Sequence, residues 1–402
     1  MAEAVRVFST GLAYFLFLFC SAWFVPAVAL ESERFSLSQP LTIRWLYNSG
    51  ATVNLTPAVD FTYIYLPLSG GSLIALHIAD GEFRWKTEIG GDFSASPVAD
   101  ERGVYVASKT TSLDNMGERT RASGMIRAIG QKSGVTRWAR TLSSPLRGAL
   151  VADSQALFGG AEDGSIYAFS KETGDILWTK QHLVSFASQP ILSAMKLYIG
   201  DENGTLLALD KKTGHIFWRY QTQGALRGYV SAVNGMIYFG SADGYVYALN
   251  ESSGKLRWRR RTGAGVQAVA YAKEGLIAAS LDNFAYFFTA NDGSLVWKRQ
   301  LPGRIAAQPI SDQDSVLFAP LVGDICIVLD LRNGKQINTL PVGDGNNTAA
   351  TPILAGDVIL ITTRSGLLAF APPFSQGSSS YREFTEGPLA GNAQARSING
   401  QR

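Results

Sequence analysis

The stretch that decides the fold of this chain is GTLLALDKKTGHIFW, residues 204–218, because close copies of it recur along the 402-residue sequence. Four copies share its apolar run, its turn and its final tryptophan: GSLIALHIADGEFRW (71–85), GMIRAIGQKSGVTRW (124–138), GSIYAFSKETGDILW (164–178) and GYVYALNESSGKLRW (244–258). Two weaker copies follow, NFAYFFTANDGSLVW (283–297) and DICIVLDLRNGKQIN (324–338). Similarity at a fixed period predicts one repeat architecture rather than two or three unrelated domains.

The tryptophans measure the length of the repeat. Beyond the N-terminal segment they stand at Trp45, Trp85, Trp138, Trp178, Trp218, Trp258 and Trp297. Their spacings are 40, 53, 40, 40, 40 and 39 residues, and a further step of 41 reaches Asn338. The one long step contains a polar insertion at 108–124. We interpret these tryptophans as packing residues and not as ligand contacts, because a large apolar side chain at a fixed place in each unit suits a core.

Each unit predicts about four short strands. The apolar run, such as LLAL within 204–218, indicates a strand buried on both faces, and the K-x-T-G piece indicates a tight turn with glycine at positive φ. The segment that ends in tryptophan is the returning strand, and two further strands precede the next copy. No helical period is sustained anywhere in the repeats. Four antiparallel strands in about 40 residues are typical of a β-propeller blade.

The two ends of the repeat region predict how the ring closes. Strands of the tryptophan type begin at eight places, but the first, TIRWLY (42–47), has no apolar strand before it. The last apolar strand, GLLAF (366–370), has no tryptophan strand after it. We therefore predict an all-β, eight-bladed β-propeller over residues 41–371, with four antiparallel strands per blade. Strand 366–370 pairs with the N-terminal segment, which removes exposed sheet edges.

The segments outside the repeats have other compositions. Residues 11–30 carry no charge and include Pro26 and the small-residue run Ala27-Val28-Ala29. This pattern predicts a signal peptide at 1–29 that is cut after Ala29, followed by a lead-in at 30–40. An uncleaved membrane anchor is the alternative, since about 20 apolar residues can span a bilayer. Residues 372–402 are rich in Ser, Gly and Pro, which predicts a disordered tail.

Charge and cysteine content exclude several classes of protein. The 36 Lys and Arg residues against 33 Asp and Glu residues give a net charge of +3, too little for a nucleic-acid binder driven by bulk charge. Two cysteines, Cys20 and Cys326, exclude a disulfide scaffold. Cys326 is interpreted as a buried, inert thiol. We expect a periplasmic or secreted monomer with no stable membrane insertion after signal cleavage.

The repeat resembles a known family. Its fullest copy has Ala208, Asp210, Thr213, Gly214 and Trp218, the pattern Ala-x-Asp-x-x-Thr-Gly-x-x-x-Trp. This pattern is similar to the tryptophan-docking repeat of the PQQ-type, quinoprotein-like eight-bladed propellers, and the resemblance covers about residues 41–370. Two branches of that family matter here: periplasmic dehydrogenases that use PQQ and calcium, and non-catalytic BamB-like scaffolds of outer-membrane β-barrel assembly. A shared fold does not by itself choose between them.

Features of the dehydrogenase branch are missing from the sequence. The resemblance to that branch would imply a longer chain, an adjacent pair of cysteines and a Glu/Asn/Asp calcium set, and the chain has no adjacent cysteine pair. The loop GDGNN (343–347) lacks both the D-x-D-x-D-G spacing and a closing glutamate. EDG (162–164), DEN (201–203) and ADG (242–244) are interpreted as hairpin turns. We predict no catalytic residue, metal or cofactor. A PQQ- and calcium-dependent dehydrogenase stays an alternative, as does a propeller that binds a carbohydrate or a peptide.

Candidate binding residues lie where each repeat enters the strand that lines a propeller's central channel. Nine residues after the tryptophan position stand, among others, Asn54, Arg147, Arg227 and Gln267. The two arginines could make one wall of the channel mouth positive and bind an acidic group or a peptide carboxylate. Arginines that are solvated, or paired with a local acid, are the alternative.

We therefore predict an exported, non-catalytic scaffold that binds a protein partner in the cell envelope, with the outer-membrane assembly machinery as the specific expectation.

The insertion at 108–124 is a second candidate contact, with an exposed loop as the plainer interpretation. The residue before Cys20 is Phe19, whereas a lipoprotein signal needs a small residue there. The absence of lipidation counts against the specific role, because such a scaffold is normally tethered.

The signal-peptide interpretation predicts the first residue of the exported protein. Cleavage after Ala29 leaves Leu30 at the mature N-terminus and removes Cys20, so the mature chain carries one thiol. N-terminal sequencing and the intact mass of protein recovered from the cell envelope measure both properties. A chain that still begins at Met1 would support the uncleaved anchor instead.

Overall fold

The computed structural model describes residues 35–50, 52, 54–111, 122–273, 275–321, 323–343, 346, 348–373, 380–385 and 394–399, the last two stretches as backbone only. Phe35 onward forms one compact unit. The predicted signal peptide and the first residues of the lead-in lie outside the described part, as do most of the insertion at 108–124 and much of the tail. No helix long and apolar enough to cross a membrane is found in the described part of the chain.

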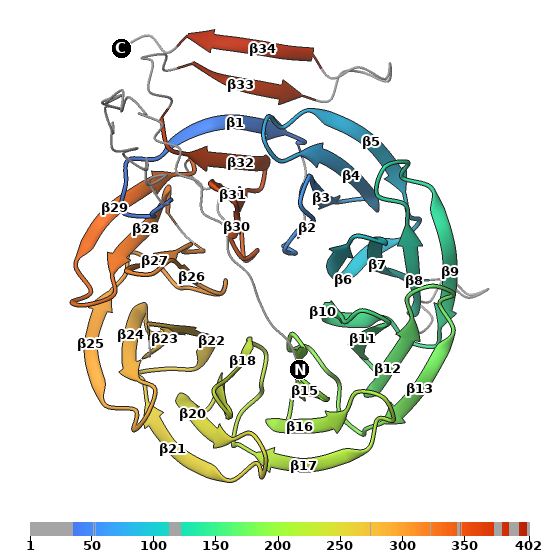
Figure 1. Cartoon of the computed structure of the whole chain (residues 1–402), viewed down its shortest axis with the longest axis vertical. Coiled ribbons are helices and arrows are strands. Elements are labelled where there is room, and N and C mark those ends of the chain that lie inside the picture. The colour runs from blue at the N-terminus through green and yellow to red at the C-terminus, as the bar shows by residue number, and fades with distance from the viewer. Residues whose placement is uncertain are drawn as a thin grey trace, which may run out of the picture. The chain divides into compact units, whose positions relative to one another are not determined.

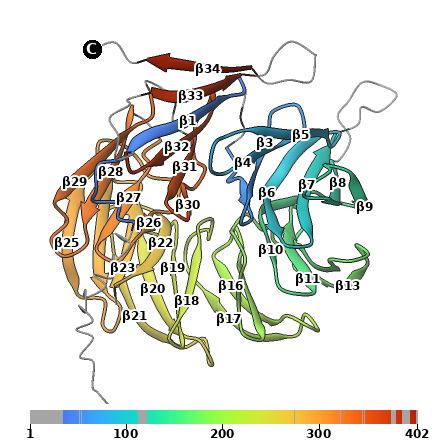
Figure 2. The ribbon, with the colours of Figure 1, turned by 45° about the horizontal axis from the view of Figure 1, so that its top comes forward.

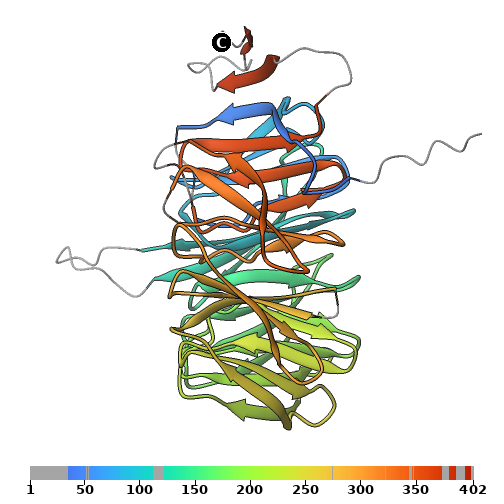
Figure 3. The ribbon, with the colours of Figure 1, turned by 90° about the vertical axis from the view of Figure 1, so that its left-hand side faces the viewer.

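Four-stranded antiparallel sheets follow one another around a ring (Figure 1). Five of them are β2–β5 (Ala58–Val59, Tyr63–Leu68, Ser72–His77, Phe83–Glu88), β14–β17 (Ile191–Ser193, Lys196–Gly200, Thr205–Asp210, Ile216–Gln221), β18–β21 (Val230–Val233, Met236–Gly240, Tyr245–Asn250, Leu256–Arg261), β22–β25 (Val266–Ala272, Gly275–Ser280, Phe284–Thr289, Leu295–Gln300) and β26–β29 (Ile310–Ser311, Ser315–Phe318, Ile325–Asp330, Gln336–Pro341). Seen edge-on, the strands cross the ring from one face to the other (Figure 3).

One larger sheet combines two groups of four strands. These are β6–β9 (Asp92–Asp100, Gly103–Thr110, Ser123–Ile129, Thr136–Leu142) and β10–β13 (Leu146–Ala152, Ala156–Ala161, Ser165–Ser170, Ile176–Gln181). A single parallel pair, Ala149 with Ser96, joins them. The predicted all-β propeller is confirmed. Hydrogen bonding yields seven sheets among the described residues, so a count of eight blades requires division at this pair, and the number eight stays a prediction.

The closing sheet contains both ends of the repeat region. Its order is β30 (Ile353–Ala355), β31 (Val358–Thr362), β32 (Gly366–Ala371), β1 (Thr42–Asn48), β33 (Ser380–Thr385) and β34 (Gln394–Asn399). β32 pairs antiparallel with β1, from Thr42 with Ala371 to Asn48 with Gly366. The predicted pairing of the C-terminal strand with the N-terminal segment is therefore confirmed.

The tail departs from its prediction. β33 lies parallel to β1 on the side away from β32, and β34 continues the sheet outward (Figure 2). The prediction of a disordered tail at 372–402 is therefore wrong for 380–385 and 394–399. The outer edge of β1 offers unpaired N–H and C=O groups, which an extended segment can satisfy. The Ser, Gly and Pro content of the whole tail conceals a short segment, SYREFT, that contains two aromatic residues.

Burial follows strand position within each sheet. The second and third strands are buried along almost their whole length, as in β3 and β4, because neighbouring sheets cover both of their faces. The fourth strand, such as β5, alternates between buried and exposed residues. This difference explains why the apolar runs of the repeat are continuous while the tryptophan segments are mixed.

Each tryptophan joins its own four-strand group to the next one along the chain. The indole N–H donates a hydrogen bond to a backbone carbonyl in the neighbouring turn between third and fourth strands. The pairs are Trp45–Ile78 (3.0 Å), Trp85–Gln131 (2.6 Å), Trp138–Lys171 (2.9 Å), Trp178–Lys211 (3.0 Å), Trp218–Glu251 (3.1 Å), Trp258–Ala290 (3.0 Å) and Trp297–Leu331 (2.8 Å). We call the face that carries these turns the tryptophan face.

A glycine in each of these turns lies under the indole ring. At Gly174, φ is +75° and a Cβ would stand 2.5 Å from the Trp138 ring. Gly214 repeats this arrangement, with φ at +69° and the Trp178 ring 2.7 Å from a Cβ. Glycine is therefore needed twice over, for its left-handed backbone and for the close approach of the ring. The Thr-Gly turn and the Trp of the repeat recur together because the glycine of one unit packs against the indole ring of another.

Asn338 takes the tryptophan place where no such turn exists. The next sheet along the ring is the closing sheet, whose third and fourth strands are β32 and β1 and therefore come from opposite ends of the chain. The lead-in residues Leu37 and Gln39 approach instead, and the Asn338 amide donates hydrogen bonds to their carbonyl oxygens, at 3.0 and 2.7 Å. A short amide suits this site because there is no glycine turn for an indole to cover.

The contact between glycine and indole predicts a difference between two Gly→Ala substitutions. Gly174 and Gly235 have nearly equal φ, +75° and +73°, but only Gly174 lies under a ring, and a Cβ on Gly235 meets nothing within 4 Å. We expect Gly235→Ala to cost about 1 kcal/mol through backbone strain alone. Gly174→Ala should cost about 2–4 kcal/mol, because overpacking adds to the strain.

The midpoint and slope of urea unfolding, followed by tryptophan fluorescence, measure this difference. Equal midpoints for the two variants would mean that the indole contact contributes nothing to stability.

Candidate functional site

The predicted channel-mouth residues come together in part. Asn54, Arg147 and Arg227 line one hollow of about 290 Å³ at the start of the first strands. The equivalent positions of other repeats, Ser94, Ala187 and Ala349, line it as well. Gln267, at the second position of β22, is not among its lining residues. The offset of nine residues after tryptophan therefore places three of the four candidates on the lining of this mouth.

Both arginines of the mouth are paired with glutamates. Arg227 Nη2 lies 2.7 Å from Glu202 Oε2, and its Nε also donates to Glu202, at 2.8 Å. These contacts raise the pKa of Arg227. Arg147 Nε lies 3.6 Å from Glu162 Oε1. The prediction that one wall of the mouth is positive is therefore wrong for its net charge, because each glutamate neutralises one guanidinium. Both glutamates belong to turns that sequence analysis assigned only to hairpins.

Hydrogen bonds link residues from four sheets at the mouth, where Thr56, Ser96 and Tyr229 also line the hollow. The Tyr229 hydroxyl and Thr351 Oγ1 lie 2.7 Å apart, and the Thr351 N–H donates to Thr56 Oγ1 at 3.0 Å. The Thr56 N–H donates in turn to Ser96 Oγ at 3.1 Å. Burial raises the pKa of Tyr229, so its hydroxyl stays protonated at neutral pH. Sequence analysis missed these residues, yet most of them share a simple signal, since they stand 11 residues after a tryptophan.

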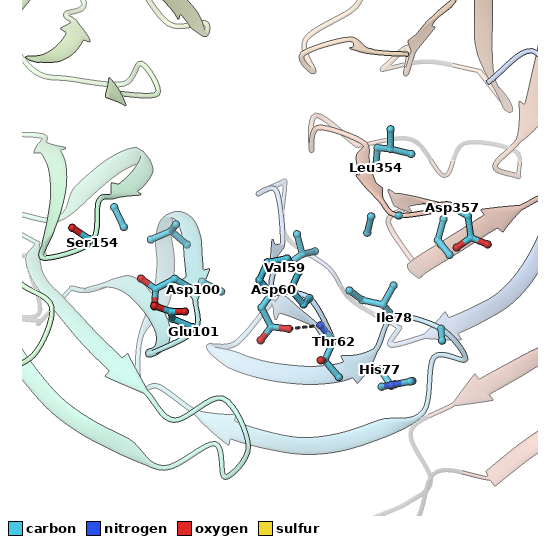
Figure 4. Close-up of a pocket in the computed structure, with 18 of the residues that line it drawn as sticks. Val59, Asp60, Thr62, His77, Ile78, Asp100, Glu101, Ser154, Leu354 and Asp357 are labelled. Carbon is cyan, nitrogen blue, oxygen red and sulfur yellow. Dashed lines mark hydrogen bonds between the residues drawn. The ribbon is translucent and has the colours of Figure 1, made fainter. Parts of the chain in front are cut away.

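A larger groove lies at the other end of the channel, on the tryptophan face. It has a volume of about 1040 Å³ and is lined mainly by the turns between first and second strands of four consecutive four-strand groups. Figure 4 shows Asp60, Asp100, Glu101, Ser154 and Asp357 around it. We call this hollow the acidic groove. None of its carboxylates was a candidate at the sequence level.

Several acidic residues of the groove hold its turns. Asp60 Oδ1 accepts hydrogen bonds from the backbone N–H groups of Thr62 and Tyr63, both at 2.7 Å. Asp100 accepts one from the Arg102 N–H at 2.9 Å, and Asp153 accepts one from the Ala156 N–H at 2.8 Å. A short acidic side chain that closes its own turn is a general property of Asp. These contacts account for the position of the carboxylates.

Cations compensate two of these aspartates. Lys171 is buried, its Nζ contacts the Asp100 carboxylate, and it donates to the Asp153 carbonyl at 2.7 Å. The Asp153 carboxylate lies 2.9 Å from Lys211 Nζ. Burial acts to raise the pKa of Asp153, but backbone N–H groups and the Lys211 ammonium outweigh it and lower the pKa. The two lysines therefore link neighbouring four-strand groups while they neutralise this wall of the groove.

The other carboxylates of the groove differ in whether a cation lies beside them. Asp357 lies 3.4 Å from Arg44. Asp60 Oδ2 accepts hydrogen bonds from the Tyr65 hydroxyl at 2.6 Å and the Gln131 amide at 2.8 Å, neither of which carries a charge. Burial and this carboxylate raise the pKa of Tyr65. Within the described residues no cation pairs with Asp60 or with Glu101.

Two features of the described residues concern the dehydrogenase alternative. Cys326 is fully buried in the core. No group of three or more His, Cys, Asp and Glu side chains suited to a metal is found in the described part of the chain. Three residues of GDGNN lie outside that part. Asp163 and Asp243 accept backbone N–H bonds from Ser165 and Tyr245, as hairpin turns require.

Comparison with known families accounts for the repeats. The family model described as outer membrane protein assembly factor BamB matches residues 42–179, 122–228 and 202–398. The chain belongs to this family. The matches overlap, as expected when one repeat fits the model in more than one register, and the last of them extends past the closing strand β32. No curated protein matches the sequence.

Solved structures agree on the fold. BamB from Moraxella catarrhalis has a TM-score of 0.71 and 13% identity, and the match covers 83% of this chain and 100% of that one. Sqt1 of Saccharomyces cerevisiae has a TM-score of 0.70 and 11% identity, with 83% and 100% covered. A computationally designed protein, Ika8, has a TM-score of 0.69 and 13% identity, with 82% and 100% covered. Since a designed protein is as similar as a natural one, these likenesses show the fold alone.

The environment of Cys326 predicts an unreactive thiol. Burial raises its pKa to about 12, so at pH 8 the thiol stays protonated. We expect native mature protein to remain unlabelled by Ellman's reagent at pH 8, because the thiol is protonated and covered. Addition of 6 M guanidinium chloride should release one equivalent of thiol. Rapid labelling of the native protein would contradict this assignment.

Proposed function

We propose that this chain is an exported, non-catalytic propeller that binds a protein partner in the cell envelope and supports the assembly of outer-membrane β-barrel proteins. The observation that carries the proposal is the match to the outer membrane protein assembly factor family, which extends from residue 42 to residue 398. A periplasmic location follows from the same proposal and from the predicted signal peptide. The fold supports a binding role, because a closed ring presents rigid loops at both channel mouths.

The channel mouth at Arg147 and Arg227 supplies the contact for the partner in this proposal. Both side chains are about half exposed, at 47% and 56%, so their ion pairs with Glu162 and Glu202 are accessible to solvent. Exposed ion pairs contribute only about 0–1 kcal/mol, and a partner carboxylate can therefore replace either glutamate at small cost. The bidentate geometry of guanidinium favours carboxylates over other anions. The mouth thus presents two arginines whose guanidinium groups are accessible to a partner carboxylate.

Substitutions of opposite sign test this mouth. Arg147→Ala with Arg227→Ala should reduce partner capture about tenfold or more, since charge-assisted contacts contribute about 1.5–3 kcal/mol each. Glu162→Gln with Glu202→Gln should increase capture, because it removes the competing carboxylates and leaves both arginines in place. Crosslinking in the native envelope, followed by mass spectrometry, identifies and quantifies the partner.

Arg84→Ala with Lys86→Ala provides the matched control, because these cations on β5 also pair with glutamates, Glu82 and Glu88, but lie outside the mouth. The control should leave capture unchanged. Equal capture by the control and the arginine variants would rule out the mouth. Failure to recover any β-barrel assembly component with the unaltered chain would overturn the scaffold proposal itself.

A further inference from the structure

The acidic groove has an apolar lining that its turns do not require. Val59 of β2, Val98 of β6 and Leu354 of β30 line it, together with Ile78, which follows β4. Figure 4 shows Val59, Ile78 and Leu354 around the same hollow. A concave surface with an apolar lining and a few polar groups is the usual form of a binding site, and about 1040 Å³ is large enough for several amino-acid residues.

Phe61 is the second unexplained feature of the groove. It lines the groove at the tip of the turn between β2 and β3, and its side chain is fully exposed. The turn itself is closed by Asp60, which bonds the N–H groups of Thr62 and Tyr63, so the aromatic ring contributes nothing to that closure. Glu101 and Ser154 occupy the same tip position in the next two turns of the groove. An isolated, fully exposed aromatic ring beside a large hollow suits a contact that a partner covers.

The charge of the groove favours a ligand of positive charge. Asp100, Asp153 and Asp357 are paired with cations, as described above, whereas Asp60 and Glu101 have no cationic partner within the described residues. The chain as a whole carries a net charge of +3, so the groove is a locally negative site on a positively charged protein. Charges beyond a Debye length of about 8–10 Å are screened, and a ligand in the groove therefore responds to these two carboxylates first.

The groove is separate from the arginine mouth. Strand β10 carries Arg147 near its first residue and Ala152 at its last, and Ala152 lines the acidic groove. The two sites thus lie at opposite ends of the same strand and present opposite chemistry. Nothing about the groove depends on the assignment proposed for the mouth.

We propose that the acidic groove binds an extended peptide segment of a protein partner in which lysine or arginine alternates with large apolar residues. The cations face Asp60 and Glu101, and the apolar side chains cover Phe61, Val59 and Leu354. A propeller with this groove holds a basic segment at one mouth of its channel and can hold an acidic group at the other.

Peptide titration against the full mature chain tests the proposal. The probe is a fluorescein-labelled hexapeptide that alternates leucine with lysine, and fluorescence anisotropy reports its binding. One comparison peptide carries glutamate in place of lysine, and another carries serine in place of leucine. We expect the leucine–lysine peptide to bind at least tenfold more tightly than either. Equal affinities for all three peptides would overturn the proposal.

Variants locate the binding. Phe61→Ser and Glu101→Gln, both exposed and remote from the core, should each weaken the leucine–lysine peptide at least fivefold. Gln313→Ser changes the tip of an equivalent turn outside the groove and should leave its affinity unchanged, as should Arg147→Ala with Arg227→Ala. Equal affinities for the Phe61, Glu101 and Gln313 variants would place binding elsewhere and overturn the assignment.

Competition separates a peptide site from a site for small amines. Hexylamine carries one ammonium and one apolar chain but has no backbone and no second cation. It should displace the peptide only at concentrations at least a hundredfold higher. Displacement at comparable concentrations would show a small-amine site, and the peptide proposal would then be wrong. Loss of peptide binding leaves capture through the arginine mouth unaffected, so failure of either proposal can be told from failure of the other.

Discussion

An indole that covers the glycine of a neighbouring turn joins one four-strand group of this ring to the next. The contact combines a hydrogen bond, such as Trp138 to the Lys171 carbonyl, with an approach so close that Gly174 cannot carry a side chain. Because each such contact needs a tryptophan in one four-strand group and a glycine turn in the next, the two residues recur together along the sequence. The period of about 40 residues, the continuous apolar strands and the ring itself all follow from repetition of this one contact.

Packing around this contact determines the residue type at some positions of the repeat, whereas other positions can vary. Strand interiors and docking turns vary little between repeats, whereas the start of the first strand carries Asn54 in one repeat, Arg147 in another and Ala187 in a third. The tips of the turns on the tryptophan face vary in the same way, as Phe61, Glu101 and Ser154 show. Both hollows described here are lined by such variable positions. A rigid repeat therefore supplies the frame, and residues that the frame leaves unconstrained determine the chemistry of each mouth.

Sequence patterns predict those features that depend on local periodicity. Tryptophan spacing locates the strands, the closing pair β1–β32 and the residues of the arginine mouth. The partners of Arg147 and Arg227 do not follow from it, because whether a long side chain reaches Glu162 or Glu202 depends on the path of a turn in space. The acidic groove cannot be predicted from the sequence pattern. It brings residues near position 60 together with residues near position 357, and only closure of the ring makes them neighbours. The hairpin β33–β34 in the tail is not predicted, because the average composition of residues 372–402 does not reveal one short extended stretch.

Closure through β1 and β32 also determines the order in which the ring can form. Thr42 pairs with Ala371, so β1 must wait for β32, near the other end of the repeat region, before its ladder is complete. Sheets in between are continuous in sequence and can form as they emerge, whereas the closing sheet has to bring together strands separated by nearly the whole repeat region, a slow step with a large loss of chain entropy. The folding chain therefore passes through an open arc in which β1 is still without β32. Such an edge is vulnerable to aggregation until the ring closes, so the seam at β1 is a place where misassembly can begin.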